Sequence, residues 1–339
     1  MPTHDPPPRT SPARLRRAVA VASWAYLGLA LAAWLAIRTA GDRWWGGSVL
    51  LFGPRWVWAA PLAPLLPAAA ALRRRSILPL ALAAVVAAGP VMGLRLNLAA
   101  NPSGRPSLRI LTCNVHGGAA DARAMKRLIA EQGPDVVVLQ ECSARWLLES
   151  LPDPWWSCYG SGEQFVASRF TVGGAREVSD RAGGIGFCGR FELRTPAGVV
   201  PLYNLHLQSP HEPLRALLHG EPAGPARVRA NIAARDEQSA AASAAAAADG
   251  GAVVVAGDFN MPCDGVIYRR WWGRFPDAFG QRGAGLGYTY RVRWTAARID
   301  HVLAGAGWRC RDCRVLPDVG SPHRPLLVEL EAAGGAAAR

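Results

Sequence analysis

The first third of this 339-residue sequence contains almost no acidic residues. Residues 1–100 carry 11 arginines and only two carboxylates, whereas residues 101–339 carry 27 basic and 23 acidic side chains. The formal charge of +13 is therefore concentrated near the N-terminus. Because Lys and Arg contacts to phosphates dominate nucleic-acid affinity, this distribution disfavours a nucleic-acid-binding domain and instead indicates a membrane-topology signal.

Cysteine is absent from residues 1–112, and all seven cysteines follow. An odd number means that at least one thiol stays free or pairs between chains, even in an oxidising compartment. Cys310 and Cys313 form a C-x-x-C pair, but the sequence lacks the second C-x-x-C or H-x-x-x-H that would complete four zinc ligands. We therefore do not expect a zinc site there.

Long uncharged segments occupy residues 18–37, 56–72 and 76–94. A helix needs about 20 apolar residues to cross a membrane, and the first and third segments have that length. The second contains three prolines and is short, but residues 44–54 can extend it. We expect about three transmembrane helices within residues 18–95. The alternatives are a cleaved signal peptide, whose apolar stretch is only ~7–15 residues long, and buried core helices.

The arginines predict the orientation of these helices. Four lie in the tail, residues 1–17, and three more form the turn Arg73-Arg74-Arg75, whereas the first loop contains Arg38, Arg43 and Arg55. Because cytoplasmic loops are enriched in Arg and Lys, we expect a cytoplasmic N-terminus and a multi-pass protein of the cell membrane. A linker, residues 96–106, then leads to an extracytoplasmic domain, residues 107–331, and to a C-terminal tail, residues 332–339.

The region after the linker alternates short apolar runs with helical stretches. Residues 108–113 and 136–140 predict strands on either side of a helix over residues 121–131. Two apolar runs, 187–193 and 199–205, flank a turn cluster and predict a β-hairpin. An Ala-rich helix over residues 228–249 precedes an apolar strand over residues 251–256. This order predicts an α/β domain.

Polar residues follow the predicted strands and are the candidates for chemistry. They are Asn114, Glu141, His206, Asp258, Asn260, Asp300 and His323. A single Asp after a strand is more often a helix cap or a turn residue. Several such side chains at neighbouring strand ends gather at one rim of a sheet, so the whole set indicates an active site.

In order and spacing these motifs resemble the endonuclease/exonuclease/phosphatase superfamily over residues 107–331. The matching segments are Thr-Cys-Asn-Val-His, Leu-Gln-Glu, Ser168-Arg169, Asn204-Leu205-His206, Arg235-x-x-Gln238, Gly-Asp-Phe-Asn, Gly287-Tyr288-Thr289, Arg-Ile-Asp and His-Arg-Pro-Leu. Three N-terminal spans before such a domain look like bacterial membrane-bound members, including those associated with teicoplanin and vancomycin resistance. The resemblance implies an α/β four-layer sandwich of two mixed β-sheets flanked by helices, after an N-terminal transmembrane helical region.

The resemblance also implies a metal-dependent hydrolase. Glu141 would hold a divalent cation, Mg²⁺ or Mn²⁺, and Asn114 would lie close to the metal or the phosphate. His206 would donate a hydrogen bond to a phosphate oxygen. The substrate would therefore be a phosphorylated molecule.

Four further residues would assist the attacking water and the phosphate. Asp258 and Asn260 would position or activate the water, and His323 would be a second imidazole at the phosphate. Asp300 would bond the other nitrogen of His323 and fix its tautomer. Whether Asp258 or His323 is the base stays open.

Two positions depart from the family pattern. Family members commonly have Ser-Asp-His where this chain has Ser-Pro322-His, and some nuclease members have Asp where this chain has His116. Both changes remove a carboxylate and leave Glu141 as the acidic metal ligand. A catalytically weakened binding protein is therefore an alternative to an active enzyme.

The favoured substrate is a phosphate or pyrophosphate ester, and a membrane tether concentrates the domain on lipid-linked (prenyl) phosphates of envelope metabolism. An extracytoplasmic nuclease or phosphodiesterase is the alternative. Inositol-phosphate phosphatases have Trp-Cys-Asp-Arg where this chain has Ala-Arg-Ile-Asp, which disfavours them. Trp155-Trp156 and Trp271-Trp272 fit core packing better than an acyl path. The sequence does not predict an oligomeric state.

A reporter enzyme fused after residue 104 tests the expected orientation. Because the arginines predict that this position lies outside the cytoplasm, a reporter that is active only outside should give signal there. A fusion after Arg74, in the turn between the second and third segments, is the control and should give the opposite pattern. A residue-104 fusion that is active only in the cytoplasm would overturn the predicted topology.

Overall fold

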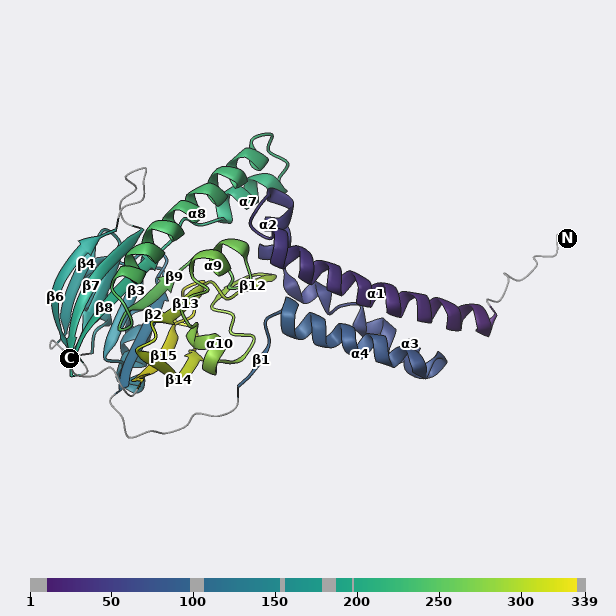
Figure 1. Ribbon diagram of the computed structural model, residues 1–339, viewed down its shortest axis with the longest axis horizontal. Coiled ribbons are helices and arrows are strands. Elements are labelled where there is room, and N and C mark those ends of the chain that lie inside the picture. The colour runs from purple at the N-terminus through teal and green to yellow at the C-terminus, as the bar shows by residue number, and fades with distance from the viewer. Residues whose placement is uncertain (1–10, 98–106, 153–155, 179–186, 197, 334–339) are drawn as a thin grey trace.

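The structure is a computed structural model that describes residues 11–97, 107–152, 156–178, 187–196 and 198–333 (Figure 1). A helical arm precedes an α/β domain. Most of the expected linker, most of the expected N- and C-terminal tails, and Trp155 lie outside the described residues.

Two sheets form the centre of the domain. The six-stranded sheet has the order β14 (Trp308–Val315), β15 (Leu326–Ala332), β2 (Ser107–Asn114), β3 (Val136–Gln140), β5 (Gln164–Ser168) and β4 (Ser157–Ser161). The five-stranded sheet has the order β13 (Asp300–Ala304), β9 (Val254–Asp258), β8 (Gly198–His206), β7 (Cys188–Thr195) and β6 (Thr171–Glu177). β2 runs parallel to β3, and β8 runs parallel to β9, whereas the other neighbours are antiparallel. Both sheets are therefore mixed.

The sheets pack face to face, and helices cover their outer faces. Ile110 and Val138 of the first sheet share one buried cluster with Leu202 and Val254 of the second. The first outer face carries α5 (Ala122–Gln132) and α6 (Ala144–Ser150), and the second carries α8 (Gly224–Ala248) and α9 (Val266–Trp271). The expected four-layer sandwich is confirmed.

Smaller elements complete the domain. α7 (His211–Leu218) packs on α8, and α10 (Ala278–Arg282) packs on β13 and β14. Two short antiparallel pairs join β1 (Arg95–Leu96) to β10 (Ala284–Gly285) and β11 (Tyr290–Val292) to β12 (Thr295–Ala297). All seven cysteines are free, and Cys310 and Cys313 lie in the core between the sheets. Trp156 and Trp272 are also buried core residues.

Local sequence explains where several of these elements begin and end. Asp121 caps α5 by accepting the Arg123 N–H, and Gly133 ends the helix with a φ of 55°. β9 extends two residues beyond the expected end at residue 256 and includes Gly257, whose φ is 140°. A Cβ atom on Gly257 would lie 2.1 Å from the Leu205 carbonyl oxygen, so only glycine allows β8 and β9 to approach there.

The helical arm extends away from the domain (Figure 1). It comprises α1 (Pro12–Ala40), α2 (Trp45–Phe52), η1 (Arg55–Trp58), α3 (Leu62–Leu72), η2 (Arg74–Ser76), α4 (Ile77–Val86) and the π-helical turn η3 (Ala87–Val91). Residues 12–40 and 74–91 are long and apolar enough to cross a membrane. The segments Trp45–Phe52 and Arg55–Leu72 meet at 85°, and together they would make a third span only if counted as one broken helix.

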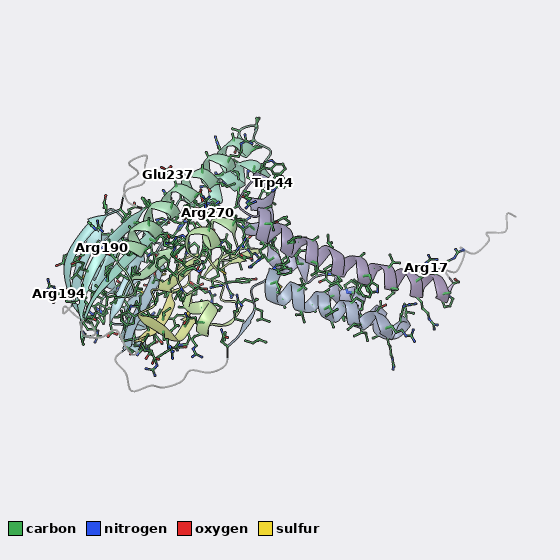
Figure 2. The ribbon with its side chains drawn as sticks, in the orientation of Figure 1. Arg17, Trp44, Arg190, Arg194, Glu237 and Arg270 are labelled. Carbon is green, nitrogen blue, oxygen red and sulfur yellow. The ribbon has the colours of Figure 1, made fainter. Side chains whose placement is uncertain are left out.

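The arm has a far end and a domain end. Val19 near the start of α1 packs with Ala69 of α3 and Leu80 of α4, whereas Ile37 near its end packs with Val91. Arg17 accordingly lies at the far end (Figure 2), on the same side as the turn over residues 73–75. The arginines of residues 11–17 and of the turn over residues 73–75 are thus separated from the α/β domain by the length of the arm.

Buried polar contacts fix the arm to the domain. The Asp42 carboxylate accepts the N–H groups of Val266 (2.6 Å) and Ile267 (3.0 Å) and so caps α9. The buried Arg55 guanidinium donates to both carboxylate oxygens of Asp264, at 2.6 and 3.0 Å. Charge-assisted, bidentate pairs of this kind impose one geometry. We call the Asp42 and Arg55 contacts the junction.

Replacing Asp264 with alanine tests the junction. The change leaves the buried Arg55 without its counter-charge, although the carbonyl oxygens of Leu51 and Val91 still accept hydrogen bonds from it. We expect a loss of about 3 kcal/mol in the free energy of unfolding, measured by chemical denaturation of the detergent-solubilised chain. Glu149→Ala, which breaks the exposed pair with Arg145, is the control and should cost less than about 1 kcal/mol. Equal effects would mean that the junction is not a stabilising contact.

Candidate active site

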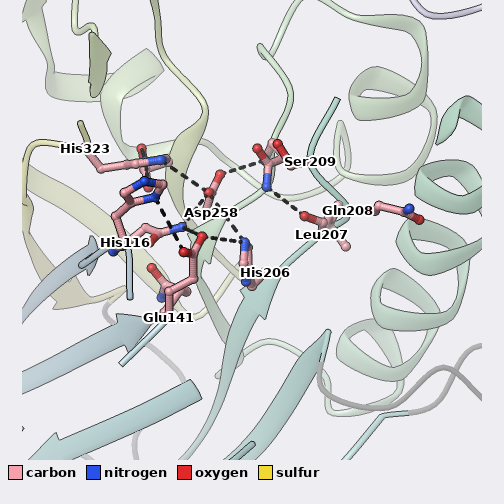
Figure 3. A network of polar contacts seen from close by, with 12 residues as sticks. His116, Glu141, His206, Leu207, Gln208, Ser209, Asp258 and His323 are labelled. Carbon is pink, nitrogen blue, oxygen red and sulfur yellow. Dashed lines mark hydrogen bonds and ion pairs between the residues drawn. The ribbon is translucent and has the colours of Figure 1, made fainter. Parts of the chain in front are cut away.

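The ends of five strands meet at one rim of the sandwich. In the second sheet His206 lies opposite Asp258, and Asp258 lies opposite Asp300, so adjacent strands put these three residues in a row. In the first sheet Asn114 ends β2, and Glu141 follows the end of β3. The packing of the two sheets brings both sets together (Figure 3).

Three residues of the site have left-handed backbone conformations. φ is 51° at His116, 50° at Glu141 and 49° at Asn260. A residue other than glycine in this region costs on the order of 1 kcal/mol or more, and such residues cluster at functional sites. The conformation turns the chain sharply after β3 and after β9, directly at the rim.

Asn114 links the two sheets through its side-chain amide. Its Nδ2 donates to Glu141 Oε1 at 2.8 Å and to Asp258 Oδ2 at 3.1 Å. Its Oδ1 accepts the N–H of His116 at 2.9 Å. The amide nitrogen therefore faces the two carboxylates, so Asn114 orients both acidic groups.

Two imidazoles lie on the open side of Glu141 (Figure 3). His206 Nε2 is 3.5 Å from Glu141 Oε1 and 3.9 Å from Asp258 Oδ2. His116 Nδ1 is 3.6 Å from Glu141 Oε2. The Glu141 side chain is 26% exposed, whereas Asp258 is almost fully buried, so Glu141 is the carboxylate that solvent reaches.

His323 and Asp300 form a buried pair on the other side of Asp258. His323 Nδ1 is 2.9 Å from Asp300 Oδ2, and His323 Nε2 is 3.8 Å from Asp258 Oδ2. Burial lowers the pKa of His323, but the charges of Asp300 and Asp258 outweigh it and raise that pKa to about 9. The ring is therefore protonated at neutral pH.

The buried Asp258 carboxylate has the opposite balance. Burial raises its pKa, and the charge of Asp300 adds to that rise, while the imidazoles of His323 and His206 and the N–H of Asn260 lower it. The net shift is upward, which makes Asp258 a stronger base than an exposed carboxylate. Its other oxygen accepts the Asn260 N–H at 2.8 Å, and Asn260 Nδ2 donates to the Leu207 carbonyl at 2.7 Å.

Hydroxyl groups hold these residues in place, and sequence reasoning gave them no role. Thr289 Oγ1 accepts the N–H groups of Ile299 and Asp300 at 3.2 and 3.1 Å. Ser321 Oγ donates to the Asn114 carbonyl at 2.7 Å and accepts the His323 N–H at 3.1 Å. Both residues lie in segments that match the family, and this match could have identified them from the sequence as residues of the site.

Pro322 and Tyr290 tie the His323 segment to the β11–β12 hairpin. The Pro322 carbonyl accepts the Arg291 N–H at 2.9 Å, and the rings of Tyr290 and His323 have centroids 5.0 Å apart. Pro322 therefore lies in the segment that positions His323. His116, at the other departure from the family pattern, contacts Glu141 directly.

Two groups of side chains have the chemistry to hold a cation. Potential ligand atoms of Asp258, Asp300 and His323 all lie within 4.8 Å of one another. Both Asp300 oxygens, however, are within 3.1 Å of His323 Nδ1, so this trio is better explained as a charge pair next to a carboxylate. Oxygens of Glu141 and Asp258 both contact Asn114 Nδ2, and these two carboxylates offer the hard oxygen ligands that Mg²⁺ and Mn²⁺ prefer.

Comparison with known proteins agrees with this geometry. Residues 111–323, more than half of the chain, match the Endonuclease/Exonuclease/phosphatase family. The chain therefore belongs to this family, whose members hydrolyse phosphoric ester bonds. No curated protein matches the sequence.

Solved structures with the same fold are distant in sequence. An endonuclease/exonuclease/phosphatase from Beutenbergia cavernae DSM 12333 is 19% identical, with a TM-score of 0.53 over 69% of this chain and 74% of that chain. A humanized D. rerio TDP2 is 14% identical, with a TM-score of 0.51 over 67% of this chain and 99% of that chain. At these identities the likeness shows the fold.

Replacing Asp300 with asparagine tests the buried pair. The change removes the nearest negative charge from His323, so the His323 pKa should fall from about 9 towards its ordinary value of about 6.5. An NMR titration of the imidazole ring in metal-free protein measures this shift, and Asp312→Asn on β14 is the control. An unchanged His323 pKa in the Asp300 variant would contradict the assigned pair.

Proposed function

We propose that this protein is a membrane-anchored, divalent-metal-dependent phosphoesterase that hydrolyses a phosphate or pyrophosphate ester outside the cytoplasmic membrane. The observation that carries the proposal is the arrangement of Glu141 and Asp258 on one Asn114 amide, with the imidazoles of His206 and His323 beside them. Acidic oxygens next to imidazole donors suit a cation and an anionic phosphoryl group together.

Glu141 and Asp258 would hold the cation. The bound cation would offset the charge that develops on the phosphoryl oxygens. The Asn114 side-chain amide donates a hydrogen bond to each carboxylate and so keeps the two close together. Because Pro322 and His116 replace carboxylates of other family members, Glu141 and Asp258 are the two acidic ligands that support this assignment.

The protonation states favour one division of roles. His323 carries a proton at neutral pH and so would donate to a phosphate oxygen or to the leaving group, not accept a proton from water. His206, which faces Glu141, would be the second donor. Asp258, whose other oxygen accepts the Asn260 N–H, would position the attacking water beside the cation.

The arm supports an extracytoplasmic domain and a lipid-linked substrate. Arg17 and the turn over residues 73–75 lie at the end of the arm that points away from the domain, as the positive-inside rule requires for a domain outside. The segments that follow Asn260 and precede Asp300 contact the arm through Asp264 and Tyr288. These contacts support a site on the side of the domain next to the arm, where prenyl phosphates would be accessible. This arrangement also supports the resemblance to membrane-bound members associated with teicoplanin and vancomycin resistance.

A substrate panel tests the proposal. Detergent-solubilised protein should hydrolyse a prenyl pyrophosphate in preference to phospholipids or single-stranded DNA, and a chelator should abolish turnover. Asp258→Ala should lower turnover by ~10²–10⁴-fold, the usual contribution of acid–base catalysis. Glu131→Ala, an exposed carboxylate on α5, is the charge-matched control.

Three results would count against the proposal. Near-native turnover by Asp258→Ala would refute the proposed site. Preferential cleavage of DNA would favour an extracytoplasmic nuclease. No turnover of any phosphoester with Mg²⁺ or Mn²⁺ would favour a binding protein.

A further inference from the structure

A cavity of about 330 Å³ lies between the helical arm and the α/β domain. One wall comes from Trp34 and Arg38 of α1 together with residues of the segment 89–95, which runs from the π-helical turn η3 to the start of β1. The opposite wall comes from residues 262–264 and from Leu286, Tyr288, Ala297 and Arg298. Neither Glu141, His206, Asp258 nor His323 lines it, so it is separate from the rim that carries the candidate active site. We call it the junction cavity.

The junction cavity has an excess of positive charge. Its charged lining residues are one carboxylate, Asp264, and four guanidiniums, those of Arg38, Arg55, Arg95 and Arg298. Arg55 pairs with Asp264, and Arg298 pairs with Asp277 at 2.5 Å, so both have counter-charges. Arg38 and Arg95 are exposed, and neither has an acidic partner in the described part of the chain. An anion would complete the charge balance of the cavity.

The cavity also lies at the level expected for lipid headgroups. Arg38 is in the last turn of α1, and Arg95 follows η3, so both are at the domain ends of segments apolar enough to cross a membrane. Trp34 lies one turn earlier on α1, where an indole suits the boundary between hydrocarbon and headgroups. Met92 and Leu286 add apolar surface beside the arginines.

We propose that the junction cavity binds the phosphate headgroup of an anionic membrane lipid, with its phosphate between Arg38 and Arg95. Guanidiniums recognise the oxygens of any phosphate monoester or diester, including a free phosphate. Two features favour a lipid over a free phosphate: the apolar wall of Trp34 and Met92, and the position at the ends of the apolar segments. Neither feature adds binding free energy for a soluble phosphate. The bound lipid is a resident ligand of the arm and not the molecule that is hydrolysed.

Lipid binding there would act on the junction and on the segment that carries Asp300. Tyr288 lines the cavity and donates through its hydroxyl to the Met92 carbonyl of the arm at 3.0 Å. The next residue, Thr289, accepts the Asp300 N–H. A headgroup held between Arg38 and Arg95 would therefore fix the ends of the arm segments to which Tyr288 is bonded, and it would stabilise the folded chain by mass action.

Lipid binding by the full chain tests this proposal without reference to catalysis. Detergent-solubilised protein in chelator would be titrated with phosphatidylglycerol, phosphatidylcholine or inorganic phosphate, with retention followed by native mass spectrometry and stability by thermal unfolding. Phosphatidylglycerol should be retained and should raise the unfolding temperature. Phosphatidylcholine should do neither, because the excess of arginines would repel its choline cation, and inorganic phosphate should do neither, because it has no acyl chains. The double variant Arg38→Gln, Arg95→Gln should bind phosphatidylglycerol at least about tenfold more weakly, because it loses both charge-assisted contacts.

The control replaces two arginines that do not line the cavity, Arg229 on α8 and Arg309 on β14, with glutamine and should bind like the wild type. Equal phosphatidylglycerol binding by the cavity variant and the control would overturn the proposal. Equal stabilisation by inorganic phosphate would show that the site does not select a lipid. If the wild type retains phosphatidylglycerol but hydrolyses no phosphoester, the proposed function fails while the lipid site stands.

Discussion

The Asp42 and Arg55 contacts of the junction determine how the rim that carries the candidate active site is oriented relative to the helical arm. Asp42 caps α9 directly after the segment that carries Asp258, and Arg55 is buried against Asp264 in the same segment. An uncompensated buried charge is expensive, so the arm and the domain cannot separate here without losing several hydrogen bonds. The rim therefore stays next to the arm, and the proposed preference for a lipid-linked ester follows from this constraint.

The sequence predicted those parts of the fold that depend on local pattern. The hairpin of β7 and β8, the helices α5 and α8 and the buried strands all leave a signature within a few residues. The end of β9 was predicted two residues short, because a glycine followed by an aspartate is typical of a turn. In the structure the glycine is needed because the backbone of Leu205 approaches Gly257 closely. The Asp42 cap joins residues 224 positions apart, and no local pattern in the sequence indicates such a contact.

For the candidate site, too, one part could be predicted from the sequence and another part required the fold. Motif order brought Glu141, His206 and Asp258 to notice, and the structure adds where their atoms point. The direction of the Asn114 amide and the protonation of His323 depend on neighbours from other strands, so sequence reasoning had left the metal contact and the identity of the base open. Electrostatic shifts of this size require distances, and distances come only from the fold.

The position of a bound cation tests the account most directly. Crystals of the protein grown with Mn²⁺ would locate the ion by its anomalous scattering, without any assumption about the substrate. The account predicts an ion in contact with carboxylate oxygens of both Glu141 and Asp258, and the Asp300–His323 hydrogen bond intact beside it. An ion bound instead between Asp300 and His323, with no contact to Glu141, would contradict the assignment of Glu141 and Asp258 as the metal ligands and of His323 as a proton donor.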